Sequence, residues 1–439
     1  MNKYISTAIA LFASASLAHG QANISPAKAQ SEKIIIMGAT VHTGNGNVIP
    51  NGYITFEKGK ITGVGDATVV KFALTDAKVI TANGKHIYPG FISPVTELGL
   101  VEIESVKATI DHSELGDMNA HIRALIAYNT DSKVPATLRS NGILMAQITP
   151  QGGTISGSSS VVQLDAWNWE DAVIKKEDAM HISWPSVPRG RGGFGGGRGM
   201  IPGGVDPNER TQNAIAALNS FFSEAITYAE TKQPVTNARL AAMKGLFNGT
   251  QKLFIAADAQ KDIVAAVNFA KKFNITPVIV GGDEAYLVTD FLKANNVIVI
   301  VKTPHSLPTN VDDDVNMPYK NVAKLHNAGV TVVISYGSSD GFWRQRSLPF
   351  VAGTASAWGI SKEEALKAIT LNAAKAMGID KTTGSIEVGK DATLFISAGD
   401  ALDMIGNKVE QAFIQGRDIN LDNLHKQLDK KFSDKYGIK

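Results

Sequence analysis

Apolar segments of strand length alternate with helical segments in the second half of the chain, and this alternation constrains the fold more than any other feature. The strand-length runs lie at 252–257, 277–280, 297–301 and 330–335. Segments with apolar residues at helical spacing separate them, at 261–272, 291–294 and 319–328. This order predicts parallel β/α units. Polar residues that follow the strands are then expected at one edge, where such folds place their chemistry.

The two ends of the chain carry a different kind of strand signal. Residues 53–56 and 61–64 flank Lys58-Gly59-Lys60 and predict a hairpin, because Gly59 is free to adopt positive φ. Near the other end, 409–414 reads as a strand before a turn at Gly416, and a charged helix is expected from Asp422. A helix is also predicted over 362–377. We expect a small β domain built from 33–88 and 389–439, around a central body at 89–388.

Length and composition agree with a globular protein of this size. The chain has 439 residues, of which 44% are hydrophobic and 19% charged, enough for a barrel of about 250–300 residues and a smaller domain. The net charge of +2 creates no field that would recruit nucleic acid or an anionic membrane. The absence of cysteine excludes disulfides and thiolate chemistry.

The first twenty residues have the pattern of a signal peptide. Lys3 supplies a positive start, 5–17 is a short apolar run, and Ala18-His19-Gly20 places small residues at the cleavage positions. The run is shorter than the ~20 residues that span a bilayer, and no later segment is long and apolar enough to do so. We therefore expect an exported protein, periplasmic in a Gram-negative host, with a polar linker at 21–32.

Residues 189–204, RGRGGFGGGRGMIPGG, interrupt the central body. Such a glycine content opposes regular structure because each glycine loses much entropy on ordering. Two interpretations remain, an RGG-type element for single-stranded nucleic acid and a surface insertion that covers a site as a lid. The near-zero net charge favours the insertion.

Three stretches carry a distinctive pattern. They are Tyr88-Pro89-Gly90-Phe91-Ile92, Leu371-Asn372-Ala373-Ala374-Lys375-Ala376-Met377-Gly378-Ile379, and Gly384-Ser385-Ile386-Glu387-Val388-Gly389-Lys390-Asp391-Ala392-Thr393-Leu394. Together they resemble the metal-dependent amidohydrolase superfamily, especially its imidazolonepropionase and prolidase-like dipeptidase branch. The resemblance covers roughly residues 33–420. It implies an α/β fold, a (β/α)8 TIM-like barrel with a small composite β-sandwich domain made from both chain ends.

The resemblance also implies metal-assisted hydrolysis, in which a divalent ion lowers the pKa of a bound water and polarises the scissile carbonyl. In the family the entry motif continues as Asp-x-His-x-His. Here the sequence is Ser93-Pro94-Val95-Thr96-Glu97, so Val95 and Glu97 stand at the histidine positions. Val95 cannot ligate. Glu97 is a candidate metal ligand through one oxygen, with a hydrogen-bonded Glu at a strand end as the alternative.

Other strand-end residues complete the candidate site. Asp340, in Ser338-Ser339-Asp340-Gly341, matches the family's catalytic Asp, and its alternative role is to cap a turn. His305 is a second candidate metal ligand, or a loop histidine bonded to backbone. Arg344 and Arg346 are candidates to bind a substrate carboxylate, or else surface charges. His112, His121 and His181 lie in segments without a ligand pattern.

Two functions follow from these observations. The first is a hydrolase acting on a C–N bond of a non-peptide, cyclic amide or dipeptide-like substrate, with an atypical zinc, manganese or iron site. The second is a catalytically inactive relative without metal, which binds a small molecule or pairs with an active paralogue. A homo-oligomer and a heteromer with such a paralogue both remain open. Zn²⁺ needs at least three protein ligands, so the loss of both histidines argues for the second function. Asp340 and the family's fold signature argue for the first, and we predict the hydrolase with the inactive relative as the alternative.

Overall fold

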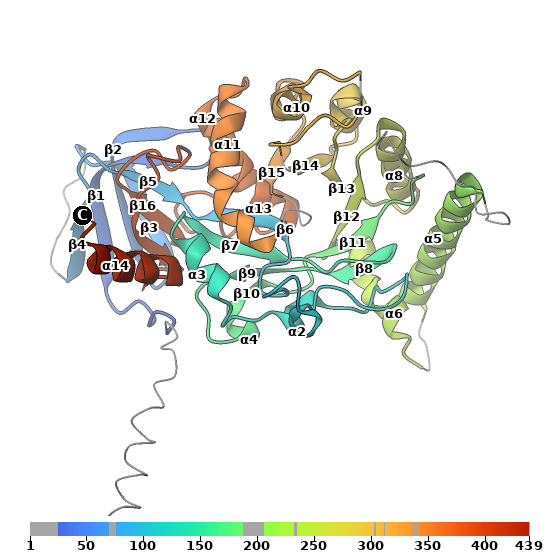
Figure 1. Ribbon diagram of the computed structural model, residues 1–439, viewed down its shortest axis with the longest axis horizontal. Helices are drawn as coiled ribbons and strands as arrows, with labels where there is room; N and C mark the ends of the chain where they lie inside the picture. The colour runs from blue at the N-terminus through green and yellow to red at the C-terminus, as the bar shows by residue number, and fades with distance from the viewer. Residues whose placement is uncertain are drawn as a thin grey trace, which may run out of the picture.

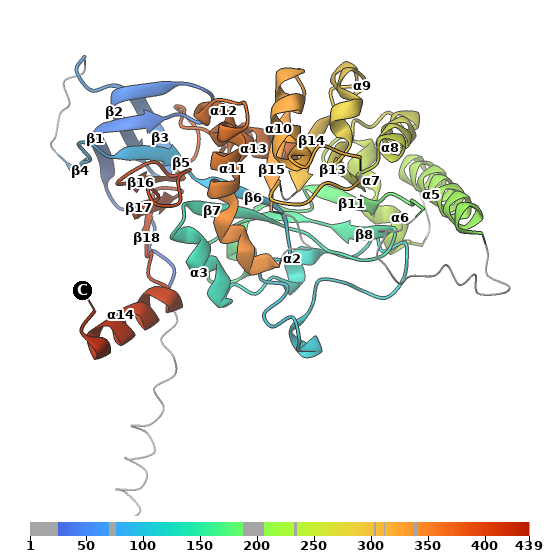
Figure 2. The same ribbon diagram turned by 45° about the horizontal axis from the view of Figure 1, so that its top comes forward.

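The computed structural model describes residues 25–69, 76–187, 206–231, 235–302, 304–310, 312–336 and 341–438. The predicted signal peptide at 1–20, the glycine-rich insertion at 189–204 and Asp340 lie outside the described residues. Three sheets form the framework, and Figures 1 and 2 show one at the side of the molecule and two in its centre.

Strands from both ends of the chain share the eight-stranded side sheet, in the order β18-β17-β16-β5-β1-β2-β3 with β4 paired to β1. Its strands are β1 (Lys33–His42), β2 (Val48–Glu57), β3 (Lys60–Asp66), β4 (Ala77–Thr81), β5 (His86–Pro89), β16 (Leu394–Ser397), β17 (Val409–Ile414) and β18 (Arg417–Ile419). The predicted hairpin is confirmed as β2–β3, with positive φ at Lys58 (51°) and Gly59 (78°). Positive φ at both turn residues matches the twist of two-residue hairpins.

The parallel β/α units predicted for 252–335 are confirmed. A six-stranded sheet has the order β15-β14-β13-β12-β11-β8, and each neighbouring pair from β11 to β15 is parallel. Its strands are β8 (Ile155–Ser158), β11 (Ala179–Ser183), β12 (Lys252–Ala257), β13 (Val278–Gly281), β14 (Ile298–Lys302) and β15 (Val332–Ser335). The carboxyl ends of the parallel strands therefore meet at one edge.

A four-stranded sheet completes the centre, in the order β10-β9-β7-β6. Its strands are β6 (Phe91–Thr96), β7 (Ile143–Ile148), β9 (Ser160–Gln163) and β10 (Val173–Lys175). The ladders of the described residues thus form two central sheets rather than one continuous ring. Side chains of both sheets meet in one apolar cluster, which includes Ile92, Met145, Val161, Phe254, Val278, Ile300 and Val333.

The α-helices are α2 (Ala124–Ala127), α3 (Lys133–Arg139), α4 (Trp169–Ala172), α5 (Pro207–Glu230), α6 (Ala238–Ala242), α7 (Lys244–Phe247), α8 (Gln260–Lys272), α9 (Thr289–Ala294), α10 (Met317–Asn327), α11 (Leu348–Ala357), α12 (Lys362–Ala368), α13 (Leu371–Met377) and α14 (Leu424–Tyr436). Short 3₁₀ turns are η1 (Lys107–Thr109), η2 (Ala285–Leu287) and η3 (Phe342–Ser347). Within the described part of the chain, none of these helices has the length and apolar character needed to cross a bilayer.

The single helix predicted over 362–377 is wrong, because α12 and α13 are separate. Thr370 lies between them with φ −130° and ψ −94°, and its hydroxyl donates to the Leu366 carbonyl at 2.7 Å. A threonine hydroxyl that bonds backbone in this way competes with helix continuation. The break also frees the Ile369 carbonyl, which accepts from the Ile92 amide of β6 at 2.9 Å.

A bulge distorts the end of β6, the strand that carries the altered entry motif. Ser93 pairs with Ala146 and Thr96 with Ile148, so β6 has one residue more than β7 between these pairs. Val95 has φ 49°, a conformation that β-branched residues rarely adopt. Bulges of this kind re-aim side chains next to active sites. Simple alternation therefore does not hold along β6, and Val95 joins the same interior cluster as Ile92.

The predicted linker at 21–32 is attached to the body where the structure describes it, from residue 25 onward. Ala27 donates its amide to Asp165 Oδ2 at 2.9 Å. Gln30 accepts from the Gly59 amide at 2.8 Å and donates to the Phe56 carbonyl at 3.0 Å. Residues 25–32 form no helix or strand, yet these bonds fix the segment against the side sheet and the end of β9.

Candidate active site

Glu97, the residue that follows β6, contacts His112. Its Oε2 lies 3.1 Å from His112 Nδ1, and the two side chains are 13% and 28% exposed. His112 is positioned by its own carbonyl, which accepts from the Gln151 amide at 2.7 Å just beyond β7. Burial raises the pKa of Glu97, the contact with His112 opposes that rise, and nearby Glu104 adds to it. The result is a half-buried carboxylate–imidazole pair in which burial disfavours the charged form of Glu97.

A second group of charges follows the next parallel strands. A Cβ built on Gly281 would lie 1.9 Å from Asp258 Oδ1 and 3.2 Å from Lys302 Cε. Glycine, with φ 105° at this position, therefore lets a carboxylate and an ammonium-bearing chain converge over β13. Asp283 accepts from Thr309 at 2.9 Å, and burial, followed by the Asp258 charge, raises its pKa.

A polar network lies buried between the two central sheets. Ser159 donates to Asp178 Oδ1 at 2.7 Å, and His181 Nε2 lies 2.8 Å from the same hydroxyl oxygen. Gln147 donates to Asp178 Oδ2 at 2.7 Å and accepts from the Val95 amide at 3.1 Å. Burial raises the pKa of Asp178 to about 6 and lowers the pKa of His181 to about 3. Gln147 thereby links this network to the bulge in β6.

The other predicted site residues contact different neighbours. His305 Nε2 lies 2.8 Å from Thr354 Oγ1, and its ring centroid is 5.7 Å from that of Tyr319. It lines a pocket with Lys362 and Asp400. His305 is therefore bonded to a side chain rather than to the backbone. It does not contact the Glu97–His112 pair. Asp340 lies outside the described residues.

Arg344 and Arg346 both stack on Trp343, with guanidinium-to-ring distances of 5.1 and 5.6 Å. Their segment, η3, is docked onto β6 by a buried bond from Ser93 Oγ to Gln345 Oε1 of 2.7 Å. The structure thus brings the two arginines together around one ring. Stacking on an aromatic face is a favourable use of the planar guanidinium.

The described strand ends do not fit a metal site of the kind the family uses. Among the residues that the structure describes, no three His, Asp or Glu side chains are grouped to hold one ion. Val95 is apolar, and its amide is bonded to Gln147. Glu284 accepts from the Gln260 amide and from Asn310. Because Zn²⁺ takes three or more protein ligands, the described residues alone do not complete such a site.

Comparisons with known proteins give similarities to amidohydrolases and imidazolonepropionases. A model described as "Amidohydrolase family" matches residues 287–423. Imidazolonepropionase of Flavobacterium psychrophilum is 32% identical over 235 residues, which cover 48% of this chain and 54% of that enzyme. Imidazolonepropionase of Symbiobacterium thermophilum is 24% identical over 384 residues, which cover 80% of this chain and 84% of that enzyme.

The match to imidazolonepropionase of Picrophilus torridus spans only 35% of that enzyme, so this chain aligns with about a third to a half of the first two relatives. Among solved structures, an amidohydrolase from Thermotoga maritima has a TM-score of 0.75 at 21% identity, covering 88% of this chain and 99% of that one. A prolidase complex has a TM-score of 0.54 at 15% identity, with the same coverage. These likenesses concern the fold. Taken together, the chain is similar to the amidohydrolase family over residues 287–423 and to imidazolonepropionases over longer stretches, and its fold is similar to that of a solved amidohydrolase.

Proposed function

We propose that this protein hydrolyses a C–N bond in a small non-peptide or dipeptide-like molecule, cyclic amides included, bound at the carboxyl ends of the central strands. One observation carries the proposal: Glu97, at a family ligand position, lies 3.1 Å from His112. A half-buried carboxylate–imidazole pair of this kind is suited to general acid–base catalysis. The similarity to the amidohydrolase family supports the reaction class, and the pair supports the location.

The geometry assigns separate roles to the two side chains. Glu97 faces His112 Nδ1, so Nε2 is the nitrogen left to accept a proton from water. The carboxylate orients the ring and stabilises the imidazolium that forms, as acids behind catalytic histidines do. His112 then returns the proton to the leaving nitrogen. Lys302, which converges with Asp258 over Gly281, supplies positive charge at the same edge for the developing oxyanion.

Substitution of the pair tests this proposal. With a panel of cyclic amides, N-acyl amino acids and dipeptides, we expect Glu97→Gln and His112→Gln each to lower kcat by roughly 10²–10⁴-fold, the usual contribution of a general acid or base. Glu410→Gln changes a carboxylate that pairs with Lys85 on the side sheet, and it should leave kcat unchanged. Turnover that survives both site substitutions would remove the pair from the mechanism.

A second candidate is an inactive relative that binds a small molecule or pairs with an active paralogue. The bulge favours it, because Val95 fills the interior where a family member carries a histidine and Gln147 holds its amide. Metal content by inductively coupled plasma mass spectrometry, together with the substrate panel, separates the two candidates. Turnover supports hydrolysis. No turnover, no zinc, manganese or iron, and ligand-induced thermal stabilisation support the binding role.

We also propose that the two central sheets close into a (β/α)8 barrel, with the side sheet as a composite β-sandwich domain. Two contacts support closure. Ser335 of β15 donates to the Pro94 carbonyl of β6 at 2.9 Å, and the Ser159 amide, beside β9, donates to the Ala179 carbonyl of β11 at 2.9 Å. Export through the signal peptide at 1–20 remains part of the proposal, and N-terminal sequencing of protein from the periplasm tests it.

A further inference from the structure

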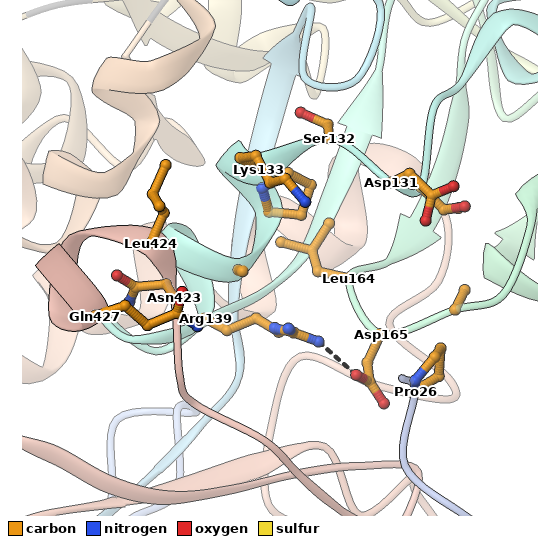
Figure 3. Close-up of a pocket in the computed structure, with 14 residues that line it drawn as sticks. Pro26, Asp131, Ser132, Lys133, Arg139, Leu164, Asp165, Asn423, Leu424 and Gln427 are labelled. Carbon is orange, nitrogen blue, oxygen red and sulfur yellow. Dashed lines mark hydrogen bonds and ion pairs between the residues drawn. The ribbon is translucent and has the colours of Figure 1, made fainter. Parts of the chain in front are cut away.

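A pocket of about 300 Å³ lies between α3, α14, the end of β9 and the N-terminal segment. Figure 3 shows Arg139 extending across it from α3 toward Asp165, with Pro26 on one side and Asn423 and Gln427 of the C-terminal part on the other. Its apolar lining includes Leu164, Ala136 and Leu424. The pocket is built from residues of α3, the β9 end and α14, whereas the catalytic pair follows β6, so the two do not share residues.

Two arginines share one carboxylate at this pocket. Asp165, whose side chain is 1% exposed, pairs with Arg139 through Oδ1 and with Arg417 through Oδ2 at 3.1 Å. Arg417 is 15% exposed and does not line the pocket, whereas Arg139 is buried and does. Asp131 and Lys133 also line the pocket, with opposite charges. Because a buried charge is costly when its counter-ion is shared, an anion beside Arg139 would be favoured.

Arg139 has hydrogen-bonding capacity that Asp165 does not use. The residue is 5% exposed, and its guanidinium donates to Asp165 through Nη1. Its Nε is buried and has no hydrogen-bond partner among the residues the structure describes. A guanidinium group offers five donors in a fixed planar arrangement. Asp165 accepts from Nη1, which leaves the edge formed by Nε and Nη2 for another acceptor. That edge matches the two oxygens of a carboxylate.

Polar neighbours in the pocket are already engaged elsewhere. Asn423 donates to Ser140 at 2.7 Å and accepts from the Lys426 amide at 3.1 Å. Gln427 donates to Asp422 at 2.9 Å, and Ser132 donates to Glu102 at 3.0 Å. Arg139 is therefore the group through which a ligand would be recognised, and the apolar walls would cover the rest of it.

We propose that this pocket binds a small monocarboxylic acid, with the carboxylate on the Nε–Nη2 edge of Arg139 and a short aliphatic or aromatic tail against Leu164, Ala136 and Leu424. The site is separate from the proposed hydrolytic site and does not depend on it. The guanidinium of Arg139 would bind the carboxylate, and the apolar wall would contact the rest of the ligand.

Calorimetric titration of the full-length protein with benzoate at constant ionic strength tests the proposal. We expect saturable one-site binding of benzoate and no binding of benzyl alcohol, which has the same ring without the charge. Chloride, sulfate and phosphate are included as competitors. Equal displacement of benzoate by all three at matched ionic strength would mean a general anion effect and would overturn the carboxylate site.

Two variants locate the binding. Ala136→Phe adds bulk to the pocket wall and leaves both members of the Arg139–Asp165 pair unsubstituted, and it should weaken benzoate binding at least tenfold. Ala229→Phe makes the same change in a pocket of about 380 Å³ beside α5 and α7, and should leave binding unchanged. Arg139→Gln should abolish binding if it remains folded by circular dichroism; if it unfolds, Ala136→Phe decides. Unaltered benzoate affinity in Ala136→Phe, or no binding to the wild type, would overturn the proposal.

Discussion

Asp178 and His181 both contact the Ser159 hydroxyl, and burial shifts their pKa values in opposite directions. The pKa of Asp178 rises from 3.8 to about 6, so the folded protein binds more protons than the unfolded chain between these values. Stability from this residue is present below pH 4 and is lost as pH rises to about 6. The pKa of His181 falls from 6.5 to about 3. Its stabilising effect is present above pH 6.5 and is lost as pH falls toward 3.

The two effects therefore oppose each other between about pH 4 and 6, and single substitutions should separate them. Relative to wild type, Asp178→Asn should make unfolding free energy rise with pH, and His181→Gln should make it fall with pH. Each difference in slope should approach about 1.4 kcal/mol per pH unit. Urea unfolding at pH 4.5, 5.0, 5.5 and 6.0 measures this. Parallel profiles for the three proteins would contradict the assignment.

At the level of single residues, the sequence proposed Glu97 as a metal ligand and did not predict its contact with His112. The entry motif identifies Glu97 by position, because the resemblance fixes where ligands stand. His112 reaches Glu97 only through a loop held by the Gln151 amide, and no local pattern encodes that contact. His181 could have been found if the strand at 179–183 had been predicted, since the polar network joins residues in or beside β7, β9 and β11.

Among the elements, the bulge in β6 has the clearest energetic consequence. Val95 is 5% exposed and has φ 49°, a left-handed conformation that costs an L-residue about 1–2 kcal/mol. Two hydrogen bonds hold the distortion, from the Val95 amide to Gln147 and from Ser335 to the Pro94 carbonyl. The strand end is therefore strained at the position where the family carries a metal ligand, a combination found at functional sites.

Glycine substitution measures that strain. Val95→Gly loses a buried side chain but relieves the left-handed conformation, whereas Val333→Gly in β15 loses a buried side chain of the same cluster without such relief. We expect Val95→Gly to destabilise by about 1–2 kcal/mol less than Val333→Gly. Denaturant unfolding of both variants provides the comparison. Equal losses of stability would show that the bulge carries no strain.

Prediction of elements succeeded where periodicity is strong and failed where small polar residues form strands. The runs at 252–257 and 297–301 are rich in β-branched and apolar residues, and both are strands. No strand was predicted over 155–163, which contains four serines and a glycine, yet these residues form β8 and β9. Their pairing with β11 and β7 supplies the stability that their own β propensity does not, since context overrides propensity in sheets.

At the scale of the whole molecule, Asp165 joins three parts of the chain. It follows β9, pairs with Arg139 of α3 and Arg417 of β18, and accepts the Ala27 amide. The side sheet, the central body and the N-terminal segment are therefore connected through one buried carboxylate. The sequence indicated the two regions but not this connection, because it depends on residues more than a hundred positions apart.

Removal of that carboxylate charge should have a large effect. Asp165→Asn leaves two guanidinium groups without their counter-charge, and we expect a loss of about 3–5 kcal/mol in unfolding free energy, as when one member of a buried ion pair is removed. Asp131→Asn, an exposed position near the same pocket, should change stability by less than about 0.5 kcal/mol. Thermal and urea unfolding of both variants check this. A small loss for Asp165→Asn would mean that solvent screens the cluster.

Because both chain ends contribute strands to the side sheet, the sheet cannot be completed until most of the chain has been synthesised. β5 ends at Pro89 and its partner β16 begins at Leu394, so about 300 residues must be translated before one edge of β5 is covered. At roughly 5–20 residues per second this takes on the order of 15–60 s. An uncovered strand edge can pair with another chain during that interval. A nascent chain that stalls before Leu394 would be left with that edge open, and its solubility would depend on a chaperone rather than on its own fold.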